Sequence, residues 1–299
     1  MPPRIDSRRY KALRTLIKVV GFVLAGWSGQ GRVQRALYRL LGGAPIVLAP
    51  RYDKKLVALA ALSLDRVLNG ADHKRFDKNN FFPLLFRHAH PGTCVIDVGA
   101  GMGDEVLDLS QLVGPDGFVL AFEPNPNAFA ALGQTVAAND LRNVRAVPQA
   151  VGAEKGFLST QGRIASWTVR KMTDGGEGAI PVTTLDAVYA EHSELFKSKG
   201  LSLIKIDTDG FDLDVLRGAR RLLADFPAAK VVVEFLPSIS YSGLRGREVL
   251  DELERMGFLI NAIQTAAVPL TSPEAREQFL RLFTDARQMI CHDVLLERR

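Results

Sequence analysis

The stretch "VIDVGAGMGDE", Val95 to Glu105, decides the fold. An apolar run carries Asp97 near its end and leads into three glycines, Gly99, Gly101 and Gly103, each separated from the next by one residue. Glycines directly behind a buried strand indicate a turn into a helix at which the backbone approaches a ligand closely. The stretch therefore predicts a site for a nucleotide-like group.

The spacing of this turn distinguishes between two kinds of nucleotide. A dinucleotide fingerprint reads G-x-G-x-x-G and holds a pyrophosphate at the helix N-terminus. Here the pattern is D-x-G-x-G-x-G, and Asp104 and Glu105 at the helix start would repel a pyrophosphate. The next apolar run, "GFVLAFEP", ends in Glu123, about 20 residues beyond the turn, where an acid accepts hydrogen bonds from ribose hydroxyls. We expect a nucleoside with a cationic or zwitterionic tail.

Short apolar runs and amphipathic segments alternate from Phe81 onward. The runs that we expect to be buried strands are "TCVIDVG", "GFVLAFE", "NVRAVPQ", "LSLIKID", "KVVVEFL", "GFLINAIQ" and "MICHDVLLE". The segments that we expect to be helices are Asp104 to Leu112, Asn127 to Asn139, Leu185 to Lys197, Leu213 to Ala224 and Arg247 to Met256. This alternation predicts an α/β fold: a doubly wound, mostly parallel, seven-stranded Rossmann-like sheet that binds ligands at its strand carboxyl ends.

Two regions depart from this rhythm. Residues 152–180 contain "AEKGFLST", "ASWTVRK" and "TDGGEGAIPV", which favour a small hairpin insertion. Residues 1–80 have a different texture, with basic helical segments and a second helical stretch from Asp53 to about Leu68. We therefore predict an N-terminal helical cap over residues 1–80 and a main domain over residues 81–299.

Charge and cysteine content narrow the functional classes. Residues 1–40 hold nine basic residues and one acid, a net charge of +8, which leaves −3 for the remaining chain. The main domain thus lacks the basic balance that phosphate-backbone binding favours, and we expect no nucleic-acid partner. Two cysteines, Cys94 and Cys291, both in apolar runs, exclude a disulfide framework and favour a reducing, cytoplasmic compartment. The five histidines show no metal-ligand spacing, so no metal is expected.

The N-terminal segment contains an apolar stretch, Val19 to Trp27, that is far shorter than the roughly 20 residues that span a bilayer. No small-residue cleavage site follows it, which argues against a signal peptide. Apolar residues lie on one helical face, as in an interfacial helix on an anionic membrane. A helix packing on the main domain or on a second subunit would show the same stripe, so both partners remain open.

The chain resembles the FkbM family of class I S-adenosylmethionine-dependent methyltransferases. The residues that carry the resemblance are "PGTCVIDVGAGMGDEVL", "VLAFEPNPNAFAAL", "NVRAVPQAVGAEKG", "IPVTTLDAVY", "LSLIKIDTDGFDLDVLRGA" and "VVVEFLPS", from about Pro91 to Ser238. The "LIKIDTDGFDLDVLRGA" block with its preceding "VTTLD" is the most specific part. Where the family usually has glutamate, this chain has Asp209.

The resemblance implies a cofactor, S-adenosyl-L-methionine, and a set of site residues. The cofactor-binding residues would be Asp97, Gly99, Ala100, Gly101, Gly103, Glu123, Pro124, Gln149, Ala150 and Asp207. Of these, Asp97 with its glycines would line the methionine and ribose end, and Gln149 with Ala150 the adenine edge. Asp207 would close the methyl-donor pocket. From their position after a strand that ends at the crevice, we also expect Asp207 or Asp209 to be catalytic, either receiving the acceptor hydroxyl proton or assisting its removal electrostatically.

Structural alternatives exist for each assignment. Asp97 would also serve to cap the first helix or hold the glycine turn, Asp207 and Asp209 to cap the next helix, and Lys205 to pair with a buried carboxylate. The function predicted is O-methyl transfer to a small molecule, sugar or lipid-linked glycan. The rivals are a nicotinamide-dependent oxidoreductase, which should show G-x-G-x-x-G, and a non-catalytic binding protein that retains the fold.

Overall fold

The computed structural model describes residues 46–48, 56–58, 81–160, 169–172, 176, 178–208, 210–235, 244, 246–263, 266–267, 272–284 and 292–298. The chain forms two compact units. One comprises Met1–Asn79, Gly101–Asp104 and Asn125–Asp140, and the other comprises Asn80–Ala100, Glu105–Pro124 and Leu141–Arg299.

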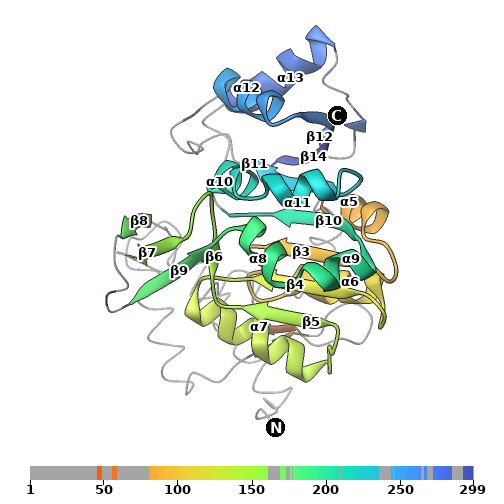
Figure 1. Cartoon of the computed structure of the whole chain (residues 1–299), viewed down its shortest axis with the longest axis vertical. Coiled ribbons are helices and arrows are strands. Elements are labelled where there is room, and N and C mark those ends of the chain that lie inside the picture. Colours follow the sequence, from red (N-terminus) through yellow and green to blue (C-terminus); the bar gives the residue numbers. More distant parts are fainter. Residues whose placement is uncertain are drawn as a thin grey trace, which may run out of the picture. The chain divides into compact units, whose positions relative to one another are not determined.

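The larger unit is built on a sheet with the strand order β13-β12-β14-β11-β10-β3-β4-β5 (Figure 1). Its strands are β3 (Cys94–Val98), β4 (Phe118–Phe122), β5 (Val144–Val147), β10 (Leu201–Ile206), β11 (Lys230–Phe235), β12 (Phe258–Ile263), β13 (Ala266–Ala267) and β14 (His292–Arg298). Strands β5, β4, β3, β10 and β11 are parallel, whereas β14 runs antiparallel between β11 and β12. The predicted doubly wound sheet of seven strands is confirmed, with the two-residue β13 added at an edge.

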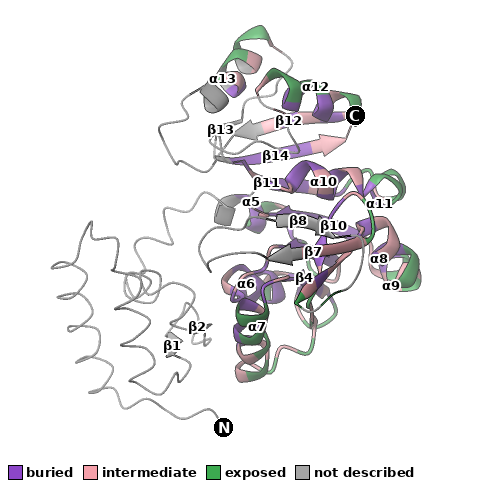
Figure 2. Cartoon of the chain, turned by 90° about the vertical axis from the view of Figure 1, so that its left-hand side faces the viewer, coloured by how far each residue is buried: buried purple, intermediate pink, exposed green. Residues whose placement is uncertain are grey.

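The helices of this unit cover both faces of the sheet. They are α5 (Phe81–His88), α6 (Asp104–Val113), α8 (Leu185–Glu191), α9 (Ser193–Lys199), α10 (Asp212–Arg217), α11 (Arg220–Asp225), α12 (Arg247–Arg255) and α13 (Pro273–Thr284). Figure 2 shows the central strands buried between them. Every residue of β3 and of β10 is buried, which is why both strands read as nearly continuous apolar runs in the sequence.

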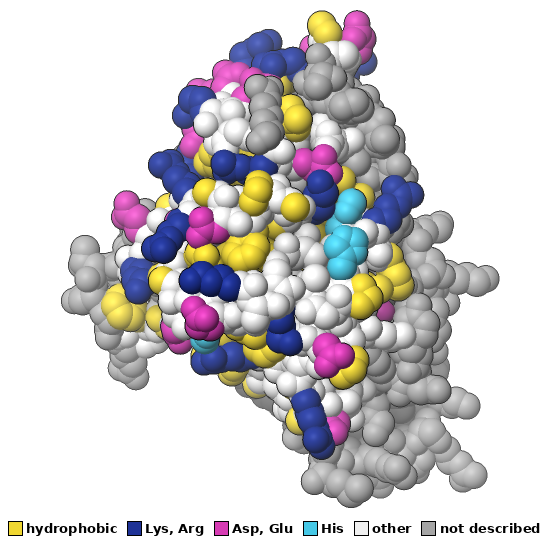
Figure 3. Space-filling view, turned by 45° about the vertical axis from the view of Figure 1, so that its right-hand side comes forward, with side chains coloured by type: hydrophobic (Ala, Val, Ile, Leu, Met, Phe, Trp, Pro, Cys, Tyr) yellow, Lys and Arg dark blue, Asp and Glu magenta, His cyan; other side chains and the backbone are white. Residues whose placement is uncertain are grey.

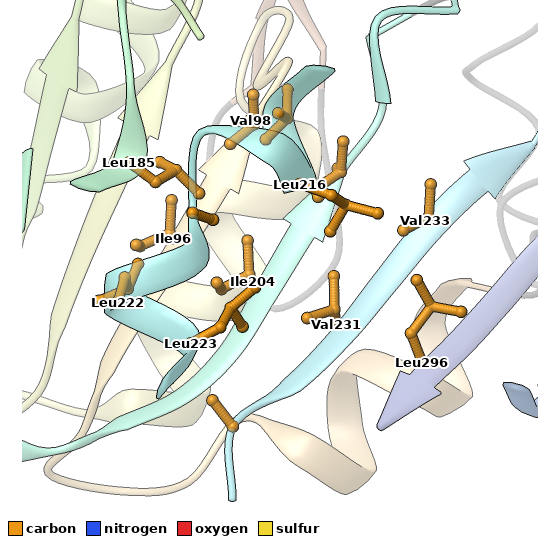
Figure 4. Close-up of a cluster of buried hydrophobic side chains, with 14 of the residues drawn as sticks. Ile96, Val98, Leu185, Ile204, Leu216, Leu222, Leu223, Val231, Val233 and Leu296 are labelled. Atoms are coloured by element: carbon orange, nitrogen blue, oxygen red, sulfur yellow. The ribbon is translucent and has the colours of Figure 1, made fainter. Parts of the chain in front are cut away.

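Each face of the sheet has its own apolar cluster. What we call the α6 face packs Val95, Val119, Leu203, Val232 and Leu295 against α5 and α6. What we call the α11 face carries a larger cluster beneath α8 to α13, to which the strands contribute Ile96, Val98, Ile204, Val233 and Leu296 (Figure 4). Neighbouring residues of one strand belong to different clusters because successive side chains point to opposite faces.

A second, four-stranded sheet occupies the region of the predicted insertion. Its order is β6-β9-β7-β8, with β6 (Ala150–Val151), β7 (Gly156–Thr160), β8 (Val169–Met172) and β9 (Ala179–Thr183). Strands β7 and β8 pair antiparallel, with Phe157 opposite Met172. This antiparallel pair lies within residues 152–180, where the sequence predicts a hairpin insertion. Ser166 and Trp167, within the "ASWTVRK" run, lie outside the described residues.

The smaller unit contains the described pair of strands β1 (Ile46–Leu48) and β2 (Leu56–Ala58), which are antiparallel, and helix α7 (Pro126–Ala138). The prediction of helix from Asp53 to about Leu68 is therefore wrong at β2. A short apolar run such as "LVA" has no periodicity that separates strand from helix. The basic helices predicted within residues 1–40 lie outside the described residues.

The helices differ from the predictions in two ways: two predicted helices are each divided in two, and two further helices are present. The segment Leu185 to Lys197 is two helices that meet at His192, and Leu213 to Ala224 is two helices that meet at Gly218. Helices α5 and α13 were not predicted, since the "FFPLLF" run of α5 has no polar face and contains Pro83. In the part of the chain that the structure describes, no helix is both long and apolar enough to cross a membrane.

Candidate active site

The first residues beyond three parallel strands are held together at one edge of the sheet. Each continues the hydrogen-bond ladder onto its neighbour: Gly99 N donates to Phe122 O (2.9 Å), Glu123 N to Val147 O (3.1 Å) and Asp207 N to Val98 O (2.9 Å). Ala100 N also donates to Phe122 O (2.9 Å) and is buried. The structure thus brings Gly99, Glu123 and Asp207 to the edge at which parallel sheets bind ligands.

Gly99 is required by the close approach of the two central strands. A Cβ atom at this position would lie 1.8 Å from the backbone oxygen of Asp207, and the φ angle of +84° is one that L-residues rarely adopt. Because the obstacle is backbone, the neighbour cannot rotate away. The first glycine of the turn therefore fixes the distance between β3 and β10 at the site.

The second half of the turn belongs to the smaller unit. At Gly103 a Cβ atom would lie 2.7 Å from Leu132 Cδ1 of α7, and Met102 O accepts a hydrogen bond from Thr135 Oγ1 of that helix (2.9 Å). Gly103 thus permits close packing of the turn on α7. At Gly101, by contrast, a Cβ atom would meet nothing within 4 Å, so this position offers space for a ligand.

A buried lysine connects the strand ends. Lys205 Nζ lies 3.1 Å from Asp97 Oδ1 and 3.7 Å from Asp207 Oδ2, and it donates a hydrogen bond to Gly99 O (3.2 Å). Asp97 and Lys205 are in register on β3 and β10 and are both 0% exposed. The prediction that Lys205 pairs with a buried carboxylate is confirmed, and through Lys205 Asp97 holds the glycine turn in place.

The lysine is charged despite its burial. Burial lowers the pKa of Lys205, but the nearby carboxylates of Asp97, Glu105 and Asp207 raise this pKa well above its ordinary value. Glu105, on α6, is itself buried. The edge of the sheet thus holds several acidic groups around a single buried ammonium. The side chain of Asp207 is 28% exposed, so it is the partly accessible member of this cluster.

The residues expected at the ribose and adenine lie beyond β4 and β5. Glu123 is 6% exposed, and its backbone is fixed to β5, so its carboxylate stands at the strand edge. Pro124 is half-buried and ends this segment. Gln149 is half-buried and directly precedes Ala150, which begins β6 and pairs with Val182. The ribose and adenine roles of these residues remain predictions.

The structural alternative in which Asp207 caps the next helix is wrong. Helix α10 begins after Phe211, and no side chain caps it. The hydrogen bonds run the other way: Asp212, the first helical residue, accepts from Thr208 N (3.1 Å) and Thr208 Oγ1 (2.7 Å). Asp207 is instead occupied with Lys205. Asp209 lies outside the described residues.

Two buried carboxylates near the site were not predicted as site residues, Glu105 and Asp293. Asp293 lies at the start of β14, opposite Glu234, and is 5% exposed. Burial and, secondly, the charge of Asp207 raise the pKa of Asp293 to about 7, while Lys205 lowers it. The only signal in the sequence was a polar "HD" pair at the start of an apolar strand. This pair indicates a site residue only when β14 is known to run antiparallel, because the strand then begins at the edge that forms the site.

The donor set fits a cationic nucleoside. The charges of Asp97, Glu105 and Asp207 act on one ammonium, and Asp293 lies close enough to be influenced by it, so the edge has an excess of negative charge that favours the sulfonium and amino groups of S-adenosylmethionine. Glu123 is placed to accept hydrogen bonds from ribose hydroxyls. In the sheet, the antiparallel strand β14 lies between β11 and β12. This sheet and this site together define a class I S-adenosylmethionine-dependent methyltransferase.

The comparisons with known proteins give the family. Residues 97–260, more than half of the chain, match the methyltransferase FkbM domain. The chain belongs to the FkbM methyltransferase family, and its methyl donor is S-adenosyl-L-methionine. This confirms the family and the cofactor that the sequence motifs predicted.

Individual relatives are more distant. An arsenite methyltransferase of Halobacterium salinarum is 37% identical over 62 residues, which span 21% of this chain and 16% of that protein. A solved methyltransferase from Aquifex aeolicus is 15% identical with a TM-score of 0.41, covering 74% of this chain and 90% of its own. A precorrin-6y C5,15-methyltransferase from Geobacter metallireducens is 12% identical with a TM-score of 0.39, covering 73% and 87%.

Proposed function

We propose that the protein transfers a methyl group from S-adenosylmethionine to a hydroxyl oxygen of a small molecule, a sugar or a lipid-linked glycan. The observation that carries the proposal is the group of carboxylates at the strand ends, Asp207 and Asp293 among them, beside the glycine turn. Carboxylates there serve both needs of such a reaction. They attract the cationic donor, and they assist the loss of the acceptor proton.

Each residue of the site has a definite task in this scheme. The bound cofactor supplies an electrophilic methyl group on its sulfonium. Glu123 holds the ribose hydroxyls, and the turn from Gly99 to Gly103 lets the backbone approach the ligand, with Gln149 and Ala150 beside the adenine. Asp97 acts through Lys205, whose hydrogen bond to Gly99 O fixes the turn. Alignment of the acceptor with the methyl group then supplies most of the rate.

Asp207 assists proton removal electrostatically. It is partly exposed at the end of β10, and its Oδ2 lies 3.7 Å from Lys205 Nζ. Its negative charge favours departure of the acceptor proton in the same region. Asp209, which follows two residues later, was predicted together with Asp207 and shares this proposal on sequence grounds.

Arsenite, the acceptor in the name of the Halobacterium relative, is a poor candidate for this chain. Thiolates are the ligands that bind soft centres of this kind. Cys94 is buried within β3, and burial raises the pKa of its thiol to about 11, so it is not a thiolate at neutral pH. Cys291 lies outside the described residues.

The acceptor is also not expected to be a nucleic acid. Beyond residue 40 the chain carries a net charge of −3. On the face drawn in Figure 3, basic side chains are interspersed with acidic ones rather than gathered into a stripe. Phosphate-backbone binding favours a continuous basic surface.

The decisive experiment combines binding with acceptor screening. Calorimetry should show binding of S-adenosylmethionine and its demethylated product but not of NAD; the reverse result would favour the oxidoreductase. Methyl-labelled cofactor is then supplied with hydroxyl, amine and thiol compounds, including sugars and polyprenyl-linked sugars. Label in methyl ethers supports the proposal, whereas label in amines or thioethers alone contradicts it. Cofactor binding without any transfer would favour the non-catalytic protein.

A cytoplasmic location with peripheral membrane contact through residues 1–40 is a separate proposal. Its support is the net charge of +8 with an apolar stripe. The full chain should then sediment with vesicles of anionic phospholipid at low salt and detach as salt rises, because salt screens the attraction. Unchanged vesicle binding after deletion of residues 1–40, or unfolding on deletion, would favour packing on protein instead.

A further inference from the structure

The α6 face of the sheet carries charged side chains where the strands meet the site. Asp97 on β3 is in register with Lys205 on β10, Lys205 with Val232 on β11, and Glu234 with Asp293 on β14. Residues two apart on a strand share a face, so Asp97, Lys205, Glu234 and Asp293 all point to the same side. The row extends from the cofactor turn toward β14.

Asp293 differs from Asp97 and Asp207 in its bonding. Asp97 and Asp207 both lie within ion-pair distance of Lys205. Asp293 is 5% exposed, and within the described residues its carboxylate takes part in no hydrogen bond and no ion pair, although its oxygens are not among the fully buried ones. Burying a carboxylate without a partner costs free energy. A carboxylate is therefore seldom retained at such a position when an apolar residue would fit.

The surroundings of Asp293 suit a group that exchanges a proton near neutral pH. Burial, then the negative charge of Asp207, raises the pKa of Asp293 to about 7, and the ammonium of Lys205 opposes this. These charges act on Asp293 from β10, Glu234 lies directly opposite on β11, and Asp97 and Glu105 act on Lys205 in turn. A general base is most effective when its pKa lies near the working pH.

We propose that Asp293 is the general base of the methyl transfer. This inference rests on the proposed O-methyl transfer. The hydroxyl proton of the acceptor passes to the Asp293 carboxylate, which becomes a neutral carboxylic acid. The acceptor oxygen forms a bond to the methyl carbon, and the sulfur–carbon bond breaks with its electron pair remaining on sulfur, which becomes a neutral thioether. The acid later returns its proton to water.

The assignment also gives Asp207 a role that its contacts allow. Asp207 is engaged by Lys205, so it is less free to take a proton itself. Its charge strengthens Asp293 as a base, because it disfavours a second negative charge nearby. Asp293 therefore receives the proton. Asp207 acts through Asp293, because its negative charge makes Asp293 the stronger base.

The first test uses two ligands that differ in charge at sulfur. S-adenosylmethionine carries a positive sulfur and S-adenosylhomocysteine a neutral one, so only the former gains when a neighbouring carboxylate ionises. In the wild type, the ratio of their affinities by calorimetry should rise about fivefold from pH 6 to pH 8. Asp293→Asn should remove this rise. Asp212→Asn, a matched change at another buried carboxyl group with a pKa of about 7, should retain it.

The results separate this inference from the proposed function. If Asp293→Asn keeps the wild-type rise, or if Asp212→Asn removes it, the assignment of Asp293 is wrong whatever the acceptor is. With a hydroxyl acceptor from the screen, Asp293→Asn should lower kcat about 100-fold or more and remove the limb of the pH profile near pH 7, with the affinity for S-adenosylhomocysteine within threefold. Wild-type turnover in a folded Asp293→Asn variant would overturn the inference, whereas transfer only to amines would contradict the proposed function.

Discussion

The two faces of the main sheet differ most at the edge that forms the site. The α11 face ends in Val98, Ile206 and Val233, all at most 1% exposed and packed on helices. One residue away along the same strands, the α6 face has Asp97, Lys205 and Glu234. At this edge, apolar burial stabilises the α11 face. On the α6 face, buried charges that form the site cost free energy.

We expect the largest effect on the difference between the two faces from removing the central positive charge, which is that of Lys205. Lys205→Met leaves Asp97 fully buried without its ammonium, which should lower the free energy of unfolding by about 3 to 5 kcal/mol. Ile204→Val, one residue away on the α11 face, should cost about 0.5 to 1.5 kcal/mol. Urea unfolding measures both.

A second variant tests the reason for the loss. Adding Asp97→Leu to Lys205→Met removes the uncompensated carboxylate and should restore much of the lost stability. If Lys205→Met alone costs less than about 1 kcal/mol, then the pair with Asp97 is not what stabilises this edge.

The glycine turn allows a comparison between two positions of one loop. Gly99→Ala would place its Cβ against the backbone oxygen of Asp207 and should cost about 3 kcal/mol, together with most of the cofactor affinity. Gly101→Ala meets no atom within 4 Å and should cost about 1 kcal/mol of stability. Melting temperature and calorimetry measure these effects. Equal losses at both positions would show that φ strain, rather than the approach of β10, governs the turn.

Much of this arrangement could be predicted from the sequence. The part that could not be predicted depends on the register between strands. The strands were predictable because β3 and β10 are buried on both faces and read as continuous apolar runs. Gly99, Glu123 and Asp207 were predictable because each follows a parallel strand. The meeting of Asp97, Lys205 and Gly99 was not, since it requires knowing that β3 and β10 are neighbours in register.

The direction of a strand was a further limit. Asp293 reaches the site because β14 runs antiparallel and so begins at the edge where the other strands end. Apolar periodicity does not give strand direction. The two helix breaks were missed for a related reason, because the amphipathic pattern continues through His192 and Gly218 although the backbone turns there.

Glu123 provides a test of the site that leaves both faces of the sheet intact. Glu123→Ala removes the hydrogen bonds to the ribose, each worth roughly 1.5 to 3 kcal/mol, and should weaken binding of S-adenosylmethionine by about 10- to 1000-fold. Glu123→Gln keeps an acceptor oxygen without the charge and should lie between. Both should melt near the wild-type temperature. Unchanged calorimetric affinity in the alanine variant would place the ribose elsewhere.

Asp212 offers the finest test, because it is a buried carboxyl group on a helix that packs on the apolar α11 face. Within the described residues, its Oδ2 has no hydrogen-bond partner, and no ammonium pairs with it. Burial is the main cause that raises the pKa of Asp212 to about 7, with Asp207 adding to it, while the hydrogen bonds from Thr208 lower it. Asp97, with Lys205 beside it, has the opposite environment.

The sign of the pH effect follows from that raised pKa. The folded state keeps the Asp212 proton up to about pH 7, whereas the unfolded chain releases it near its ordinary pKa of 3.8. Stability that is fully present below about pH 4 is therefore lost as the pH rises to 7, by on the order of 1 kcal/mol per pH unit. Asp212→Asn, which keeps the acceptor for Thr208, should lack this part of the slope and gain on the wild type as the pH rises. Parallel curves for the two proteins between pH 4 and 7 in urea unfolding would mean that Asp212 titrates normally, and that the apolar face tolerates an ionised carboxylate as readily as the face that carries Lys205.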